Sequence, residues 1–170
     1  ELKKNKDGKL KILYAGSPGK KDYIRTILEG IARLESDALK QITVTVAGIT
    51  KQQLESVCGV SKEIIEKIET SLVLLGRIPR EEVLELLKET DITIFLRSMR
   101  QRYAKAGFPT KFVESMMHGV PVMTNCTSDL VEYLKDKENG IIIEKETNEA
   151  VENAIRTILG MSSEERYAMK

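Results

Sequence analysis

Tryptophan is absent from this 170-residue sequence, histidine occurs once, and there are only two cysteines. Cys58 and Cys126 form no C-x-x-C pattern, which excludes a zinc ribbon and a disulfide-rich scaffold. Metal-ligand spacing is missing from the rest of the sequence as well, so we expect no bound metal. Such sparing use of cysteine is typical of a reducing compartment and predicts a cytoplasmic protein.

Long apolar stretches are also missing. None approaches the roughly 18–20 residues that a membrane-spanning helix needs, and the first residues lack the pattern of a secretory signal peptide. Lysine and arginine (27) nearly balance aspartate and glutamate (26), for a formal net charge of +1. That balance gives no reason to expect nucleic acid or an anionic membrane as a partner. We therefore predict no transmembrane segment and no nucleic-acid ligand.

The length and the 41% hydrophobic content fit one ordinary domain with a real core and exclude a disordered chain. The chain opens with a polar run, residues 1–8, and does not begin with Met. We interpret residues 1–8 as a linker from an amino-terminal domain that is missing here, and residues 9–170 as the domain itself. Contact with the inner face of a membrane is then expected only through the missing part.

Strand-like and helix-like segments alternate along the whole chain. Short apolar runs predict strands at 10–15, 42–46, 72–75, 92–96, 120–123 and 141–143. Apolar residues three and four apart predict helices between them, and the pairs Thr50/Gln53 and Ser162/Glu165 are typical of helix starts. The strands are apolar on both faces, as in a parallel sheet covered by helices. We predict an α/β fold: a doubly wound, Rossmann-like parallel sheet of about six strands.

Sheets of this kind bind ligands beyond the carboxyl ends of their strands, where the strand order reverses. With the common order 3-2-1-4-5-6, that crevice lies between the first and the fourth strand. Residues 16–21 and residues 97–111 should then flank it. The second loop is the only long irregular segment that we predict, and loops of that length are usually functional.

Several familiar sites are excluded by their spacing. Residues 16–21 read GSPGKK, which lacks the G-x-G-x-x-G of dinucleotide-binding folds, and no P-loop occurs. No acidic cluster follows the first strand, no nucleophile elbow is found, and no catalytic residue is identified. Anion binding remains: Gly16 and Gly19 let amides approach a ligand, and Lys21 stands at a helix start. A plain turn with a surface lysine explains the same residues.

The second loop and the helix after it add further candidates. Amides near Thr110 and Lys111 can hold a phosphate at the start of the helix. Glu114 follows about one turn later, spaced to accept hydrogen bonds from a diol such as a ribose. The alternative is an exposed ion pair between Lys111 and Glu114. Four basic residues form either a lid over a diphosphate or a set of solvated charges: Arg97, Arg100, Arg102 and Lys105.

Other notable side chains receive structural interpretations. His118 ends a predicted helix, where a cation is favourable, and we assign it no catalytic role. Met116, Met117 and Met123 are expected in the core. Cys126 follows a strand but has no identifiable base beside it, so we expect an inert thiol.

Five segments form a recognisable series: residues 107–122 (GFPTKFVESMMHGVPV), 75–83 (LGRIPREEV), 91–96 (DITIFL), 139–143 (NGIII), and 14–16 (YAG) followed by Lys21 and Asp22. In order and spacing they resemble signature segments of the group 1 (family 4) glycosyltransferases. The longest is similar to the family pattern G-F-P-x-K-x-x-E-x-M-A-x-G-x-P-V. The resemblance spans nearly the whole chain.

This resemblance implies the carboxy-terminal, donor-binding half of a GT-B fold, whose other half binds the acceptor. It implies retaining transfer of a sugar from a UDP- or GDP-type nucleotide-sugar to an acceptor in polysaccharide or glycolipid synthesis. No cofactor is obligatory, and the fragment alone is expected to be inactive. The implied donor-binding residues are Gly16, Ser17, Lys21, Ile78, Gly107, Phe108, Pro109, Thr110, Lys111 and Glu114.

Within that set the resemblance also implies individual roles. Lys21 would grip the donor diphosphate, and the backbone of Ile78 would touch the base. Thr110 and Lys111 would offer amides to the phosphates, and Glu114 would hold the ribose.

The sequence departs from the family pattern at two positions. Ala106 stands where the family often has a glutamate eight residues before Glu114, and Ser17 stands where it often has an arginine. Two alternatives therefore stay open. One is a non-catalytic module that binds a nucleotide or a protein partner. The other is half of a sugar-nucleotide epimerase or a phosphorylase, which shares the architecture.

Overall fold

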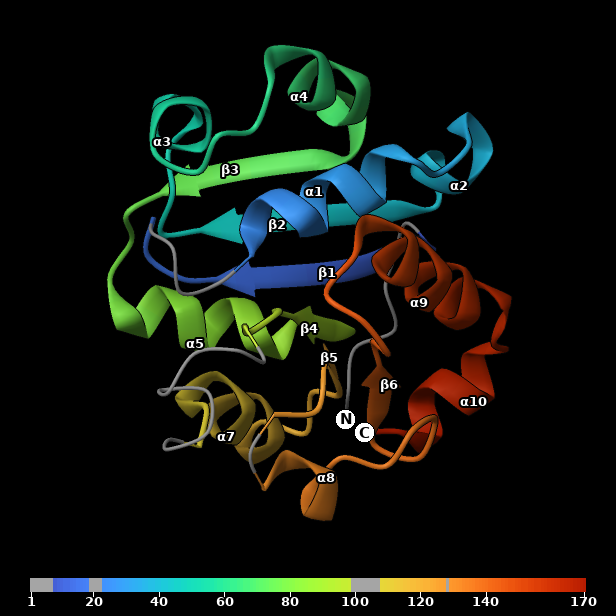
Figure 1. The fold of residues 1–170 in the computed structure, drawn as a ribbon. Coiled ribbons are helices and arrows are strands. Elements are labelled where there is room, and N and C mark those ends of the chain that lie inside the picture. Colours follow the sequence, from blue (N-terminus) through green and yellow to red (C-terminus); the bar gives the residue numbers. More distant parts are fainter. Residues whose placement is uncertain (1–7, 19–22, 99–107, 128) are drawn as a thin grey trace.

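The computed structural model describes residues 8–18, 23–98, 108–127 and 129–170. They form a six-stranded parallel sheet in the order β3-β2-β1-β4-β5-β6 (Figure 1). The strands are β1 (Leu10–Ala15), β2 (Ile42–Ala47), β3 (Leu72–Gly76), β4 (Ile92–Ile94), β5 (Val122–Thr124) and β6 (Gly140–Ile142). The prediction of a doubly wound, Rossmann-like sheet is confirmed, including the reversal of strand order between β1 and β4.

Helices connect the strands at nearly all of the predicted places. They are α1 (Ile24–Ala32), α2 (Ser36–Lys40), α3 (Lys51–Ser56), α4 (Lys62–Ile68), α5 (Arg80–Lys88), α7 (Thr110–Met117), α8 (Leu130–Tyr133), α9 (Asn148–Gly160) and α10 (Ser163–Ala168). Both predicted capping boxes are present, at the start of α3 and at the start of α10. The short helix α2 was not predicted, because its five residues carry too few apolar positions to show a period.

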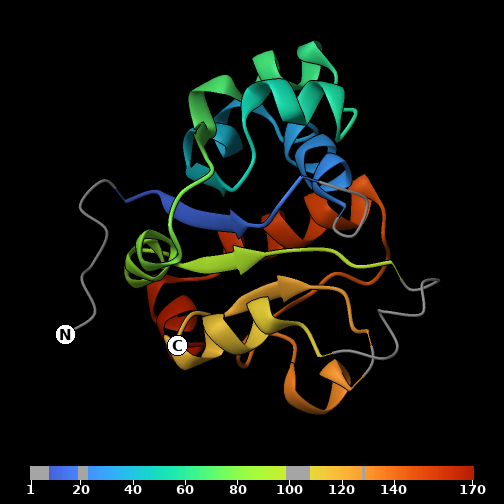
Figure 2. The same ribbon diagram turned by 90° about the vertical axis from the view of Figure 1, so that its left-hand side faces the viewer.

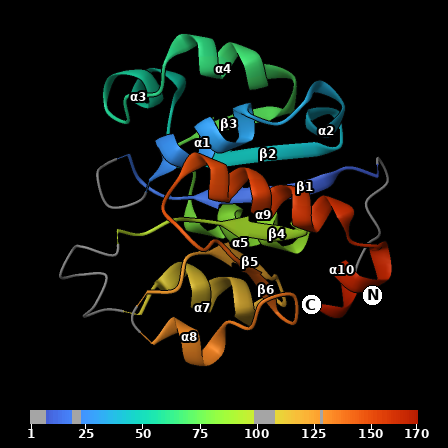
Figure 3. The same cartoon turned by 45° about the vertical axis from the view of Figure 1, so that its right-hand side comes forward.

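The two faces of the sheet carry different helices. The largest core cluster joins β1, β2 and β4 to α1, α4 and α9, and α1 lies beside α9 (Figure 3). On the opposite face, Leu13 and Ala47 pack with Leu87 of α5, and Phe95 packs with Phe112 of α7. Figure 2 shows the green helix α5 and the blue helix α1 on opposite sides of the sheet. The central strands therefore have helices on both faces, as their apolar residues require.

Two packing predictions were wrong. The edge strand β3 is not buried on both faces, because Val73 and Leu75 point outward and are exposed. Met117 is not a core residue: 79% of its surface is exposed, since it lies on the outer side of α7. Met123 is fully buried as predicted, and Met116 is half-buried against the cluster around Phe112.

None of the helices formed by the described residues is long and apolar enough to cross a membrane.

Candidate functional site

The carboxyl ends of β1 and β4 meet where the strand order reverses, and one hydrogen bond ties the segments that follow them. The amide of Tyr23, which precedes α1, donates to the carbonyl of Leu96 beyond β4 over 3.3 Å. Beside it the backbone of Arg97 pairs with the buried side chain of Asn125, which accepts from the Arg97 amide and donates to the Arg97 carbonyl. Both predicted flanking loops therefore leave the sheet at the same edge.

Glycines follow β1 and β2 at this edge and pack directly on one another. A Cβ atom on Gly48 would lie 2.1 Å from the carbonyl oxygen of Gly16, and Gly48 has a φ of +97° that other residues rarely adopt. The Gly16 amide donates to Ala47, so it belongs to the sheet and is not available to a ligand. The edge beyond β1 is thus lined by backbone, and the adjacent Ser17 is exposed.

The start of α7 reaches the same edge. Pro109 precedes the helix and is buried, and no side chain caps the first turn. The Thr110 amide has no hydrogen-bond acceptor among the described residues. Lys111 extends its side chain to β1, where its Nζ lies 4.8 Å from the centre of the Tyr14 ring. A helix start with an open amide and a cation beside it favours an anionic ligand.

Glu114 lies one turn further along α7 and is held from a third element. Arg80 Nη2, at the start of α5, donates to Glu114 Oε1 over 2.8 Å. The alternative in which Lys111 and Glu114 form a surface ion pair is wrong, since the Glu114 carboxylate binds Arg80. Glu114 Oε2 has no hydrogen-bond partner among the described residues, and the side chain is 34% exposed. The carboxylate is thus oriented and still accessible to a donor of hydrogen bonds.

The other candidates divide into those near this edge and those outside the described residues. Ile78 is half-buried between β3 and α5, near Leu84. Phe108 lies directly before α7 and makes edge-to-face contacts with Phe112 and Tyr133, with ring centres 5.5 and 5.2 Å apart. Six predicted site residues lie outside the described part of the chain: Gly19, Lys21, Arg100, Arg102, Lys105 and Gly107.

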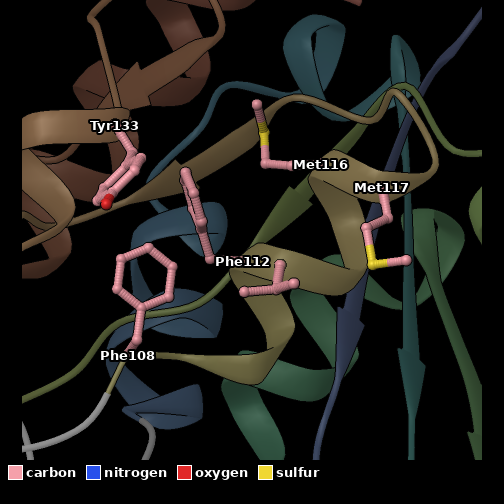
Figure 4. Close-up of a pocket in the computed structure, with 6 residues that line it drawn as sticks. Phe108, Phe112, Met116, Met117 and Tyr133 are labelled. Carbon is pink, nitrogen blue, oxygen red and sulfur yellow. The ribbon is translucent and has the colours of Figure 1, made fainter.

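An open apolar groove of about 500 Å³ lies beside the site, on the outer side of α7 and α8. Figure 4 shows Phe108 and Phe112 facing Tyr133 from α8, with Met116 and Met117 further along α7. Its walls carry no ionisable side chain except the Tyr133 phenol, among the residues that the structure describes. The groove therefore differs in chemistry from the charged edge that Lys111 and Glu114 form.

Neither Cys126 nor His118 is arranged for catalysis. Burial, with a smaller contribution from the charge of Asp136, raises the pKa of the Cys126 thiol, so thiolate is disfavoured. His118 ends α7, and its Nδ1 lies 2.8 Å from the Glu114 carbonyl oxygen, as expected for a helix-end residue. Among the described residues no three His, Cys, Asp or Glu side chains gather as metal ligands would.

Two residues of the site were missed by sequence reasoning. Tyr14 was assigned to a strand and to the family segment at residues 14–16, with no role in binding, because an aromatic residue in an apolar run is usually core. Arg80 was regarded only as part of the motif at residues 75–83. Its pairing with Glu114 joins residues 34 positions apart, and no local period indicates such a contact.

The sequence comparison decides the family. The family model described as "Glycosyl transferases group 1" matches residues 2–170. The chain belongs to the group 1 glycosyltransferases. No curated protein sequence matches it significantly.

Solved structures show the same fold as this glycosyltransferase chain. HepE from Anabaena, solved in complex with UDP, has a TM-score of 0.74 at 15% identity, covering 95% of this chain and 42% of HepE. The C-terminal domain of LpcC from Francisella tularensis, a group 1 family protein, has a TM-score of 0.72 at 19% identity, covering 95% and 80%. WaaG, a glycosyltransferase involved in lipopolysaccharide biosynthesis, has a TM-score of 0.70 at 20% identity, covering 97% and 41%.

These matches identify the sheet as the type found in the C-terminal domains of GT-B glycosyltransferases. This group 1 chain spans about two fifths of the length of HepE and WaaG.

Proposed function

We propose that this chain is the donor-binding half of a retaining glycosyltransferase, which moves a sugar from a UDP- or GDP-type nucleotide-sugar to an acceptor. The observation that carries the proposal is the meeting of β1, α5 and α7 at one edge of the sheet. A cation, an open amide and an oriented carboxylate lie there together: Lys111, Thr110 and Glu114. Such a set matches a diphosphate joined to a ribose.

The phosphate groups would lie against the backbone edge at Gly16 and the first turn of α7. When the sugar leaves, negative charge develops on the diphosphate. Amides, a helix start and lysine side chains stabilise that charge where it forms, without reorganising. No protein nucleophile is needed for this contribution, and no metal is assigned to it.

The ribose would lie one linkage away, at Glu114. An ionised carboxylate offers only acceptors and a cis-diol offers two donors, so the two groups are complementary. The hydrogen bond from Arg80 Nη2 to Glu114 Oε1 orients the carboxylate and leaves its second oxygen for the diol. The base would then extend toward the segment after β3, where the Ile78 backbone is the proposed contact.

The relatives support the substrate class. HepE was solved with UDP, and WaaG is involved in lipopolysaccharide biosynthesis. We propose a related role in polysaccharide or glycolipid synthesis, at the cytoplasmic side of the membrane. Since the chain spans about two fifths of these relatives, we also propose that an amino-terminal domain binds the acceptor, that residues 1–8 link to it, and that residues 9–170 bind the donor without transferring sugar on their own.

A second candidate function rests on Ala106. Where the family pattern has a glutamate that contacts the sugar, this chain has a methyl group. A module that binds nucleotide but transfers nothing would keep the phosphate and ribose contacts and lose the sugar contact. Donor hydrolysis by the full-length protein separates the two functions.

The first experiment is thermal unfolding of the 170-residue chain with UDP, GDP, ADP and the matching free nucleosides. A nucleoside diphosphate at a concentration about 100 times its Kd should stabilise the fold by about 2.7 kcal/mol. We expect a clear shift with UDP or GDP and little shift with the nucleoside. No shift with any of the three diphosphates would contradict the proposal.

A further inference from the structure

The Lys111 side chain crosses from α7 to β1 and is held there by a buried ring. Its Nζ lies 4.8 Å from the centre of the Tyr14 ring, and only 1% of Tyr14 is exposed. A Cβ atom on Gly16 would lie 2.7 Å from Lys111 Nζ and 2.7 Å from the Tyr14 hydroxyl oxygen. Ring, ammonium group and glycine backbone therefore occupy one small volume at the end of β1.

This arrangement fixes an ammonium group that would otherwise sample many rotamers. A lysine head over the face of a tyrosine is attracted by the ring, and more strongly so where water is partly excluded. A side chain that is already ordered loses less freedom when it binds a ligand. Since Gly16 has no side chain, the ammonium can approach the backbone closely at this position.

The groups around the ammonium suit an anionic ligand. The open amide of Thr110 lies on the same first turn of α7 and would donate to the same ligand. The carboxylate of Glu114, three residues further along the helix, is directed to Arg80 on α5. The neighbouring Ser17, after Gly16, carries no charge of its own. Lys111 therefore brings a positive side chain to the end of β1 from a different element.

We propose that Tyr14 is a positioning residue: its buried ring holds the Lys111 ammonium at the end of β1, where the ammonium meets the donor diphosphate. The inference rests on the proposed function and deepens it: it assigns a role to a residue of the buried strand β1. The ammonium donates up to three hydrogen bonds, which suits two adjacent phosphates.

The test compares Lys111→Met with Lys111→Arg in the 170-residue chain, by calorimetric titration with UDP, GDP and their nucleosides. Lys111→Met keeps most of the apolar stem and loses the charge, so affinity for the better diphosphate should fall by at least about tenfold. Nucleoside affinity should stay within about twofold. Lys111→Arg keeps the charge and should recover most of the affinity. The control is Lys88→Met, which removes an exposed charge at the far end of α5.

Tyr14 is tested through the preference for diphosphate over nucleoside, a ratio that a loss of stability alone does not change. Tyr14→Phe keeps the ring face and should keep the ratio, whereas Tyr14→Leu should lower it by roughly threefold. A Tyr14→Leu chain that keeps the wild-type ratio, or a Lys111→Met chain that binds diphosphate within about twofold of wild type, would overturn the inference and leave nucleotide binding by the chain intact. A wild-type chain that binds no diphosphate would overturn both.

Discussion

The two halves of the sheet, which meet between β1 and β4, differ in how far their neighbouring strands pair. In the first half, β1 pairs with β2 along six residues, from Leu10↔Ile42 to Ala15↔Ala47. In the second half, β4 pairs with β5 only at Thr93↔Val122 and Ile94↔Met123. We call β1–β3 with α1, α4 and α9 the core half, and β4–β6 with α7 and α8 the site half. The largest hydrophobic cluster centres on the core half, and a small one belongs to the site half.

The division matches what each half gives to the proposed site. The core half offers a backbone edge at Gly16 and Gly48, which needs long, well-paired strands to hold it in place. The site half offers Lys111 and Glu114 on a helix whose outer side is apolar and exposed. The proposed site therefore combines a rigid backbone from one half with side chains on a lightly packed helix from the other. We expect the core half to be the more stable of the two.

The largest effect should come from filling the backbone edge of the core half. In Gly48→Val, the new Cβ would meet the Gly16 carbonyl oxygen at 2.1 Å, and the φ of +97° disfavours any branched residue. We expect failure to fold, measured by circular dichroism and expression yield. The control is Gly59→Ala, at a φ of +70° with only Arg25 Nη1 nearby at 3.8 Å, which should cost about 1–2 kcal/mol. Equal stability of the two variants would contradict this explanation.

The next comparison applies one substitution to both halves. Leu28 in α1 and Leu130 in α8 are each fully buried, in the large and the small cluster respectively. Leu28→Ala should destabilise by roughly 3–5 kcal/mol, because its surroundings cannot collapse into the cavity. Leu130→Ala should cost about 2–3 kcal/mol, since its cluster is small and the half-buried side chains packed against it, such as Met116 and Ile142, can relax into the space. Urea unfolding measures both values. If Leu130→Ala lost more unfolding free energy than Leu28→Ala, the site half would be the more tightly packed one, contrary to this account.

A smaller effect concerns the ion pairs that join α1 to α9. Glu152 Oε2 accepts from Arg33 Nε over 2.6 Å, and Glu152 Oε1 accepts from Arg156 Nε and Nη2. The hydrogen bond from Arg33 is the main cause that lowers the pKa of the Glu152 carboxyl below its usual 4.5. A lowered pKa stabilises the fold above pH 4.5, and this contribution disappears as the pH falls through the folded-state value.

The corresponding variant is Glu152→Gln. At pH 7 it should lower the free energy of unfolding by no more than about 1 kcal/mol, with a modest fall in Tm, because the arginines are partly exposed. It should also flatten the loss of Tm below pH 4.5. Thermal unfolding of both chains between about pH 7 and pH 3 measures the two slopes. Parallel curves would mean that Glu152 does not contribute to the acid sensitivity.

The smallest effect should follow substitution on the exposed side of α7. Met117→Gln replaces a side chain that is 79% exposed and should change stability by less than about 0.5 kcal/mol. UDP affinity should also be unchanged, because Met117 lines the apolar groove (Figure 4) and is not among the residues proposed to bind the nucleotide. Unfolding and titration of this variant check both statements. A marked loss of UDP affinity would extend the site into the groove.

The fold was predictable from the sequence wherever the chain obeys local rules. Strand runs, helix periods and both capping boxes follow from neighbouring residues, and the strand order follows from a common topology. The exposure of apolar side chains on the outer strand β3 and on the outer side of α7 was not predictable from the sequence. Leu75 and Met117 are of residue types that usually lie in a core, and only the fold shows that no described element covers them. The Arg80–Glu114 and Tyr14–Lys111 contacts join distant segments, so only the folded chain reveals them.

The measurement that tests the account most directly is the preference for ribose over deoxyribose. Wild type, Glu114→Gln and Arg80→Ala would each be titrated with UDP and 2′-deoxy-UDP, or with the guanosine pair if GDP binds better. We predict that wild type prefers the ribonucleotide by roughly tenfold. Glu114→Gln should bind more weakly and lose most of the preference, whereas Arg80→Ala should lose less of it, because it removes the ion pair that orients the carboxylate but keeps the carboxylate. A ratio of one in both wild type and Glu114→Gln would contradict the assignment of Glu114 to the ribose.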